Sequence, residues 1–336
     1  MLGKHRFIAL VLLIILYAGV CHGAETLVQR EVVEKLVMTL DASSWKETSI
    51  QISNDGRHVA YTGYAGKDRF LVVDGKEGKR YEGIGYGKQV FSPDGSRTAY
   101  AVIAGDKRFV VVDGVEGKLY DGIGKNGPVF SPDGKRLAYA ARIDKKWCVV
   151  IDDKEDKIYD GVLDSPPVFS SDSARFAYGA ISEKVFSGRQ ACIVVDGKED
   201  KFHDSIGPSG PVFSPDAKRI AYAGLTKKRW SVVIDGKEEK GYDGIKEGTI
   251  VFSPDSKRVA YVVQIKDPTK KLEDKYFVVV DGKEGKVYDG IGGGSPVFSP
   301  DSKHVAYVAR ANSMYFVVMD DKEGEKKYAL IGPNSL

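Results

Sequence analysis

The sequence predicts an all-β protein made of seven copies of one small sheet, and three observations support this. A cassette close to FSPDGKRLAYAA (residues 130–141) recurs along the chain with spacings of 39, 39, 39, 44, 39 and 46 residues. A fixed period over most of a chain indicates an array of one supersecondary unit. The unit is rich in turn signals, and its third segment is continuously apolar. The aspartate of the cassette stands at Asp55, Asp94, Asp133, Asp172, Asp216, Asp255 and Asp301.

Each repeat is interpreted as four strands, and residues 127–162 serve as the example. PVFS is a short strand that ends at residues 131–134, Ser-Pro-Asp-Gly, which follow the type I turn pattern. RLAYAA begins the second strand, and KWCVVID is the third, dense in β-branched and aromatic residues. DDKEDK is a polar turn, and KIYDGV is the fourth strand. Four strands with tight connections in a 39-residue period leave no room for a helix.

The third strands have no polar face. Residues 109–112 and 278–280 are apolar without interruption, whereas a sheet with one face in water would alternate. Small four-stranded sheets packed face to face around an axis are the blades of a β-propeller. The sequence therefore predicts a closed seven-bladed β-propeller of four-stranded antiparallel blades over residues 47–336. A recurrent Ala-Tyr pair, as at Ala138-Tyr139, is expected to pack in the core.

The recurrent FSPDGKR-x-AY cassette resembles the TolB-type propeller repeat, which also occurs in propeller domains of prolyl oligopeptidase relatives and of the tricorn protease. The resemblance covers residues 48–332. It implies the fold but not the function, because such propellers serve as binding proteins and as accessory domains of enzymes. Full strands at both ends, residues 47–53 and 326–332, predict ring closure without strand exchange.

The first residues have the pattern of a signal peptide. Lys4 and Arg6 precede a 14-residue apolar run, residues 7–20, and small residues follow it. The run is short for a membrane-spanning helix. We expect a signal peptide over 1–23, a periplasmic or secreted location, and no stable membrane span after cleavage. The alternatives are an uncleaved anchor and, less favoured because Val20 is not small, a lipid anchor on Cys21.

The segment 24–46 is expected to be helical. Residues 25–40 place apolar side chains at helical spacing, at Val28, Val32, Val33, Leu36, Val37 and Leu40. This pattern predicts an amphipathic helix against the propeller, and the alternative is a partner-binding arm.

The net charge argues against a nucleic-acid partner, and the positions of the cysteines argue against a disulfide. A formal net charge of +3 gives no strong field for nucleic acid. Cys148 and Cys192 lie four residues before Asp152 and Asp196, so they occupy the same position in successive repeats. Equivalent side chains point the same way. We therefore expect two buried free thiols, although an exporting cell would permit a disulfide.

No motif indicates catalysis. GIGKNG (122–127) matches the dinucleotide pattern, but a strand follows it where a helix is needed. DDKED (152–156) has lysine among the positions that calcium ligands require. His58, His203 and His304 occupy framework positions that arginine or tyrosine fills in other repeats. We expect no enzyme activity, no cofactor and no metal.

Two repeats are longer than the rest, and a specific site is expected where repeats differ. The insertions, residues 181–190 and 264–275, lie between the second and third strands, on the face that carries the blade-to-blade connections. An exposed aromatic among cations suits an acidic or peptide partner. Neutral loop drift is the alternative. The predicted partner-binding residues are Lys184, Phe186, Arg189, Lys266, Lys270 and Lys271, with Tyr86 and Lys125.

The sequence thus favours an exported, monomeric, non-enzymatic propeller that binds an unidentified protein or peptide. A hydrolase or lyase with a site in the central pocket is the alternative. A structural envelope protein without a small ligand is the third possibility.

Overall fold

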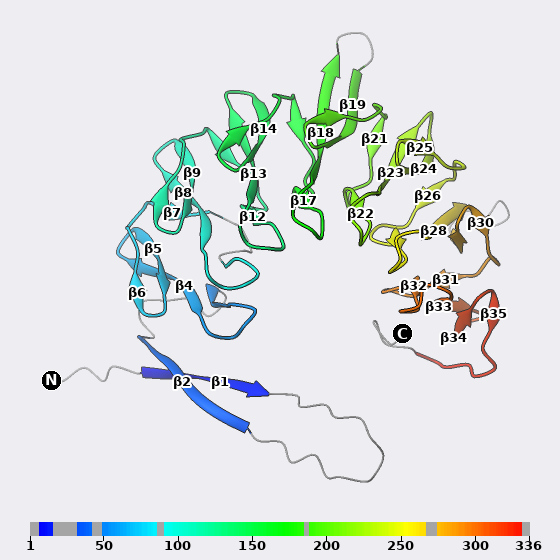
Figure 1. The fold of residues 1–336 in the computed structure, drawn as a ribbon, viewed down its shortest axis with the longest axis horizontal. Coiled ribbons are helices and arrows are strands. Elements are labelled where there is room, and N and C mark those ends of the chain that lie inside the picture. The colour runs from blue at the N-terminus through cyan, green and yellow to red at the C-terminus, as the bar shows by residue number, and fades with distance from the viewer. Residues whose placement is uncertain are drawn as a thin grey trace. The chain divides into compact units, whose positions relative to one another are not determined.

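The computed structural model describes residues 7–15, 32–41, 49–85, 91–184, 188–266 and 274–330. Within those ranges the chain is all β, without an α-helix. It forms seven sheets of four or five strands and one separate two-stranded ribbon (Figure 1). The chain divides into two compact units, residues 1–135 and 136–336.

The first unit holds the ribbon and sheets one and two. Sheet one has the order β3 (Gln51–Ile52), β4 (Val59–Ala65), β5 (Asp68–Val73) and β6 (Lys76–Glu77). Sheet two has the order β7 (Gly83–Ile84), β8 (Ala99–Ala104), β9 (Lys107–Val112) and β10 (Val115–Glu116). Two further short strands of this unit are β11 (Gly122–Ile123) and β12 (Val129–Phe130).

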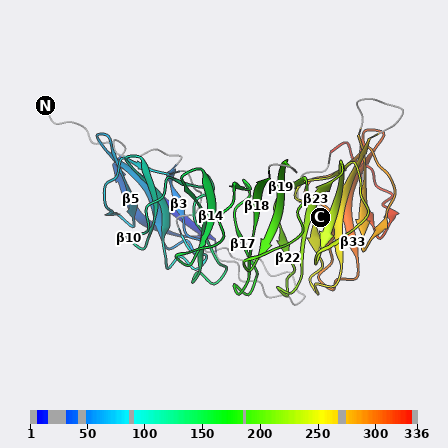
Figure 2. The same ribbon diagram turned by 90° about the horizontal axis from the view of Figure 1, so that it is seen from above.

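The second unit repeats one sheet pattern, and Figure 2 shows several of its strands side by side. Sheet three includes β13 (Leu137–Ile143), β14 (Lys146–Ile151) and β15 (Lys154–Glu155). Sheet four contains β16 (Gly161–Val162), β17 (Val168–Phe169), β18 (Phe176–Lys184), β19 (Gly188–Val195) and β20 (Lys198–Glu199). Sheet five contains β21 (Ser205–Ile206), β22 (Val212–Phe213), β23 (Ile220–Thr226), β24 (Arg229–Ile234) and β25 (Lys237–Glu238).

Sheets six and seven complete the series. Sheet six contains β26 (Gly244–Ile245), β27 (Val251–Phe252), β28 (Val259–Lys266), β29 (Asp274–Val280) and β30 (Lys283–Glu284). Sheet seven contains β31 (Gly290–Ile291), β32 (Val297–Phe298), β33 (Val305–Ala311), β34 (Met314–Met319) and β35 (Lys322–Glu323). In both sheets two short strands pair with the first long strand, which forms a hairpin with the second long strand, and a third short strand pairs with the second.

The seven sheets confirm the predicted fold class, a seven-bladed β-propeller. The middles of the third strands are buried without alternation, as in β9 and β14. Burial on both faces explains why these strands lack a polar side. The recurrent tyrosine is core packing as predicted, since Tyr178, Tyr222 and Tyr261 are at most 1% exposed. Closure of the ring stays a prediction.

The predicted fourth strand, KIYDGV, is wrong. The fourth strand of sheet three is β15, which follows β14 through a two-residue turn. Asp152 and Asp153 both have positive φ, 51° and 63°, as a type I′ hairpin turn requires. Tyr159 then makes only an isolated bridge to Trp147 of the same sheet. From the sequence, the segment DDKEDK is interpreted as a turn because its residues are polar. Lysine and glutamate are nevertheless compatible with a strand at the edge of a sheet, where their side chains are solvated.

The two residues that end a repeat, Gly-Ile in most repeats, belong to the next sheet. β16 pairs with β18, and β21 pairs with β23 in the same way. The preceding aspartate fixes this crossing. Asp160 accepts a hydrogen bond from the Lys146 ammonium group and one of 2.7 Å from the Glu183 backbone N–H. One repeat of sequence therefore does not coincide with one sheet.

A repeated arginine joins adjacent blades. The Arg219 Nε donates to Asp235 Oδ2 of its own sheet at 2.9 Å. Its Nη1 donates to two carbonyl oxygens of sheet six, 3.1 Å to Ser256 and 2.8 Å to Lys257. The guanidinium carbon lies 5.3 Å from the ring centroid of Phe252. The same contacts recur at Arg97, Arg136, Arg175 and Arg258. The Phe and Arg of the cassette, and the backbone of the two residues that follow its Ser-Pro-Asp, are therefore interface residues between blades.

The charged hairpin turns are also structural. Lys201 pairs with Glu238 of the next sheet at 2.9 Å, and Lys240 pairs with Glu284 at 2.8 Å. The aspartate of the hairpin turn also accepts a backbone hydrogen bond from the second strand of its sheet. Asp235 Oδ1, for example, accepts the Ile220 N–H at 2.9 Å. The alternation of charges in DGKEGK is therefore explained by a ladder of ion pairs between sheets.

His203 replaces the bridging tyrosine in sheet four and is 1% exposed. Its Nδ1 lies 3.0 Å from Thr226 Oγ1, and its Nε2 lies 3.3 Å from Tyr222 Oη. Glu238 Oε1 is 3.5 Å from Nδ1. Burial is the largest influence and lowers the pKa of His203 below its ordinary value, despite the opposing effect of Glu238. The histidine is a framework residue, as predicted.

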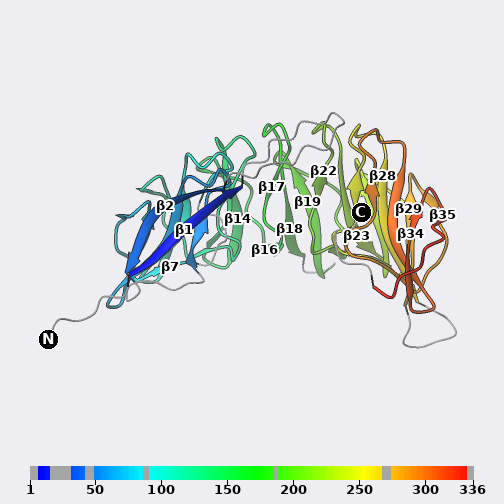
Figure 3. The same ribbon diagram turned by 90° about the horizontal axis from the view of Figure 1, so that it is seen from below.

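The expected helix over 25–40 is wrong for the part that the structure describes. Residues 32–41 form β2 (Val32–Asp41), antiparallel to β1 (Phe7–Ile15), as Figure 3 shows. Valine and threonine at 32, 33, 37 and 39 are β-branched and lose side-chain freedom in a helix. Residues 25–31 lie outside the described residues, and signal-peptide cleavage stays a prediction. Among described residues, no helix is long and apolar enough to cross a membrane.

Cys148 and Cys192 are buried free thiols, which confirms the prediction from their equivalent positions. Burial raises the pKa of Cys192 to about 12. Both thiols therefore act as small core residues.

Candidate functional site

The structure confirms where the insertions lie but describes only some of the predicted site residues. The described residues of the first insertion, 181–184 and 188–190, belong to β18 and β19. Those of the second, 264–266 and 274–275, belong to β28 and β29, so both insertions lie on the second and third strands of their sheets. Arg189, Lys266 and Lys125 are exposed. Lys184 ends β18, with its side chain outside the description. Tyr86, Phe186, Lys270 and Lys271 lie outside the described residues. This partner-binding set stays a prediction.

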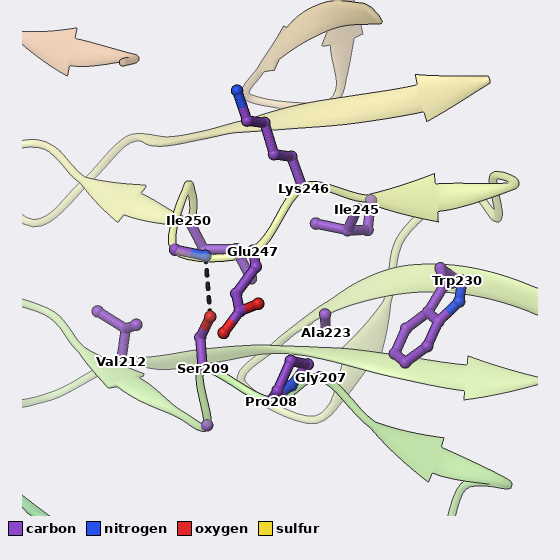
Figure 4. Close-up of a pocket in the computed structure, with 12 residues that line it drawn as sticks. Gly207, Pro208, Ser209, Val212, Ala223, Trp230, Ile245, Lys246, Glu247 and Ile250 are labelled. Carbon is purple, nitrogen blue, oxygen red and sulfur yellow. Dashed lines mark hydrogen bonds between the residues drawn. The ribbon is translucent and has the colours of Figure 1, made fainter. Parts of the chain in front are cut away.

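A cavity of about 120 Å³ lies between the connecting turns of sheets five and six (Figure 4). The turn 207–210 forms one side, and residues 245–250 form the other. The Ser209 Oγ accepts a hydrogen bond of 2.8 Å from the Gly248 N–H and so joins the two turns. In Figure 4 the Trp230 indole lies beside Pro208 and Gly207 at one end of the cavity. The wall is mostly apolar, with Val212, Ala223, Trp230, Ile245 and Ile250.

Two open clefts continue from this cavity. The first, of about 390 Å³, runs from Trp230 of sheet five to Tyr276 of sheet six. The second, of about 370 Å³, runs from Tyr276 to Tyr315 of sheet seven. Lys246 lines the cavity and both clefts. The three hollows therefore form one continuous surface, called here the groove.

The groove contains a row of aromatic side chains in register. Trp230, Tyr276 and Tyr315 hold the same position near the start of the third strand, since each makes the same isolated bridge to the tyrosine that follows it. All three are partly buried. The position holds Arg69 and Arg108 in sheets one and two, Trp147 in sheet three and Ala191 in sheet four. Sequence analysis missed this row, which comparison of that single repeat position would have revealed.

Lys246 breaks the repeat at a second position. Glycine stands there at Gly85, Gly124, Gly207 and Gly292. The Lys246 Nζ donates to the Ile291 carbonyl oxygen at 2.6 Å and lies 6.0 Å from the Tyr276 ring centroid. Among described residues it forms no salt bridge, and burial lowers the pKa of its ammonium group. A partly desolvated cation with one hydrogen bond can still donate to an anion.

Two of the three carboxylates that line the groove are neutralised by ion pairs, and the third, Glu247, lines the cavity and the first cleft without a salt bridge among the described residues. Asp243 pairs with Arg229 at 2.7 Å and accepts the Lys266 backbone N–H at 3.0 Å. Asp289 pairs with Lys275 at 2.6 Å, and this hydrogen bond is the main reason why the pKa of Asp289 is lowered. These aspartates fix the strand crossings. They contribute little negative charge to the groove, where Lys246, Lys266 and Arg310 also lie.

The groove combines ion-paired aspartates, aromatic side chains and a partly buried lysine. Asp243 and Asp289 are the ion-pair partners of Arg229 and Lys275. The bond from Lys275 lowers the pKa of Asp289, so Asp289 is poorly suited to accept a proton near neutral pH. The hydrogen-bond partner of the Lys246 ammonium group is the Ile291 carbonyl oxygen, which cannot take its proton. Within the described ranges, no group of three side chains could hold a metal ion. Aromatic faces, an apolar cavity and a lysine without a salt bridge among the described residues can hold a ligand.

No family model and no curated protein matches the chain. Solved structures share the propeller architecture at low identity. A crystal structure described as the eukaryotic initiation factor is 15% identical, covers 77% of this chain and 70% of its own, and has a TM-score of 0.46. TolB from Acinetobacter baumannii is 15% identical, with 83% and 79% coverage and a TM-score of 0.34. A putative 6-phosphogluconolactonase from Bacteroides uniformis is 14% identical, with 83% and 95% coverage and a TM-score of 0.34. These similarities do not bear on function, and the TolB-type assignment stays an expectation.

Proposed function

We propose that the protein is an exported binding module that holds a peptide segment of a partner protein in the groove of sheets five to seven. The observation that carries this proposal is the aromatic residue at one strand position in three successive sheets, Trp230, Tyr276 and Tyr315. Aromatic side chains supply large contact area at low entropic cost and dominate many binding interfaces. Because they stand on strands rather than loops, their positions are fixed before binding.

The form of the groove supports a chain-like ligand. The two clefts are lined by equivalent residues of successive sheets, with Asp243 corresponding to Asp289 and Gln264 to Arg310. A repeated surface of this kind suits a ligand that itself repeats, such as an extended backbone. The cavity of about 120 Å³ then has the size to accept one aliphatic side chain. A hydrolase or lyase is less well supported, because the aspartates here serve as ion-pair partners.

A display selection with a random dodecapeptide library, followed by calorimetric affinities for the selected peptides, tests this function. Trp230→Ala with Tyr276→Ala should weaken the selected peptides about 30-fold, which corresponds to about 2 kcal/mol. Trp147→Ala is the matched control, because Trp147 holds the same strand position in sheet three. Peptides that bind equally well to both variants, or a selection that yields no peptide, would contradict the proposal.

A further inference from the structure

The charge distribution of the groove indicates which peptides it holds, and this inference rests on the proposed function. Lys246 is the central residue, because it lines all three hollows and replaces a glycine. An ammonium group that is partly removed from water loses hydration, and other polar contacts must replace that hydration. The structure supplies one hydrogen bond, from Nζ to the Ile291 carbonyl oxygen at 2.6 Å. No carboxylate among the described residues supplies the rest.

The Lys246 ammonium group faces the second cleft. In Figure 4 its side chain extends away from Ser209 and Glu247, toward the neighbouring sheet. The bond to Ile291, in β31, places the same group against sheet seven. Arg310 lines this cleft from β33, and its Nη2 donates to the Asp289 carbonyl oxygen at 3.1 Å. Two cations thus flank one cleft whose carboxylate, Asp289, is held by Lys275.

The apolar cavity lies on the other side of the Lys246 stem. Val212, Ala223, Ile245 and Ile250 make most of its wall apolar, and Ser209 and Glu247 also line it. Tyr276 lines both clefts, so it lies between the apolar and the cationic parts of the groove. The groove is therefore complementary to a ligand with an apolar group next to a negative one.

We infer that the groove selects acidic peptide segments, with an aliphatic side chain in the cavity between sheets five and six and a carboxylate at Lys246 and Arg310. A lysine ammonium group and an arginine guanidinium group both bind carboxylates through charge-assisted hydrogen bonds. Arg310 supplies charge from the exposed rim, whereas Lys246 supplies a preorganised donor. Glycine stands at this position in four other sheets and leucine in sheet four, so this cation is particular to sheet six.

The dodecapeptide selection tests the inference when it is run in parallel on the wild-type protein and on Lys246→Gly. Glycine is tolerated by the repeat at four equivalent positions, so Lys246→Gly is expected to fold. Peptides from the wild-type protein should carry Asp or Glu at a fixed distance from an aliphatic residue. Changing that acid to its amide should weaken binding to the wild-type protein at least tenfold, but to Lys246→Gly less than twofold. Lys246→Arg should keep the acid preference.

The outcomes separate this inference from the proposed function. Peptides that depend on Trp230 but show no acid preference, or the same acid preference in Lys246→Gly, would overturn the carboxylate site and leave the peptide-binding function standing. A selection without peptides that depend on Trp230 would overturn both. Acid preference that disappears only in Lys246→Gly, with the aliphatic preference retained, supports the inference.

Discussion

Replacing Arg219 by methionine should destabilise the propeller at the joint between sheets five and six. The guanidinium group donates to Asp235 of its own sheet and to the carbonyl oxygens of Ser256 and Lys257 in the next. Methionine preserves much of the apolar contact with Phe252 but none of these hydrogen bonds. The carbonyl oxygens then lose a charged donor in a partly buried place.

The expected loss follows from the exposure of the site. A hydrogen bond to a charged group contributes about 1.5–3 kcal/mol when buried. The Arg219 side chain is 30% exposed, so we halve the lower value to about 0.75 kcal/mol for each carbonyl contact. The cation–π contact with Phe252 adds about 0.5 kcal/mol, and the Asp235 pair adds about 0.3 kcal/mol. The free energy of unfolding should fall by about 2 kcal/mol.

Equilibrium unfolding in urea at pH 7, with the slope compared between variants, measures this change. Arg57→Met is the matched control, because the Arg57 side chain is 80% exposed and its salt bridge to Asp55 is 3.7 Å long. The control should lose less than about 0.5 kcal/mol. Arg219→His should lie between the two, since His58 and His304 at this position keep the aspartate contact. If Arg219→Met changes stability no more than the control does, arginine is not the joint between blades.

Three further predictions concern acid stability, thiols and the insertions. Burial lowers the folded-state pKa of His203, so the stability that its neutral form supplies is present above about pH 6.5 and is lost as the pH falls below that value. His203→Tyr should reduce the dependence of the urea unfolding midpoint on pH between about pH 7 and pH 5. The same pH dependence in the variant and the wild-type protein would contradict this. Thiol titration of the denatured, unreduced mature protein should count two free thiols, Cys148 and Cys192, and a count of zero would contradict their burial as free residues. Phe186→Ala combined with charge reversal at 270 and 271 should weaken capture of the native partner but leave the thermal midpoint unchanged. Matched charge changes in the DGKEGK turns should not weaken capture, and the opposite pattern would place the partner on the other face.

The architecture could be predicted because the same residues build every blade. The turn Ser-Pro-Asp-Gly and the apolar third strand recur at nearly constant spacing, so a repeat with an ambiguous pattern can be interpreted from the other repeats. Strand boundaries were harder. Gly161–Val162 follows Tyr159 without a break in the sequence pattern, yet the ion-paired Asp160 sends this pair to the next sheet. The N-terminal segment does not repeat, so helical spacing alone could not outweigh the β-branched residues of β2.

The site was only partly predictable, for a related reason. Sequence analysis found differences in length, which led to the two insertions, but not differences in residue type at constant length. Trp230 and Lys246 lie in repeats of ordinary length. Each stands out only when its residue type is compared with the residues at the same position in the other repeats. Whether an aromatic at that position is core or surface depends on the neighbouring sheet. The recurrent tyrosine of the second strands, such as Tyr222, is buried, so recurrence of an aromatic residue does not by itself distinguish core from surface.

Photo-cross-linking tests most directly whether the groove is the binding surface. Benzoylphenylalanine is placed at position 276, between the two clefts, or at position 147, the same strand position in sheet three. Each protein is irradiated with a dodecapeptide selected on the wild-type protein, and the product is measured by mass spectrometry. We predict a covalent adduct from position 276 and none from position 147. An adduct from position 147 without one from position 276 would contradict a ligand site in the groove of sheets five to seven.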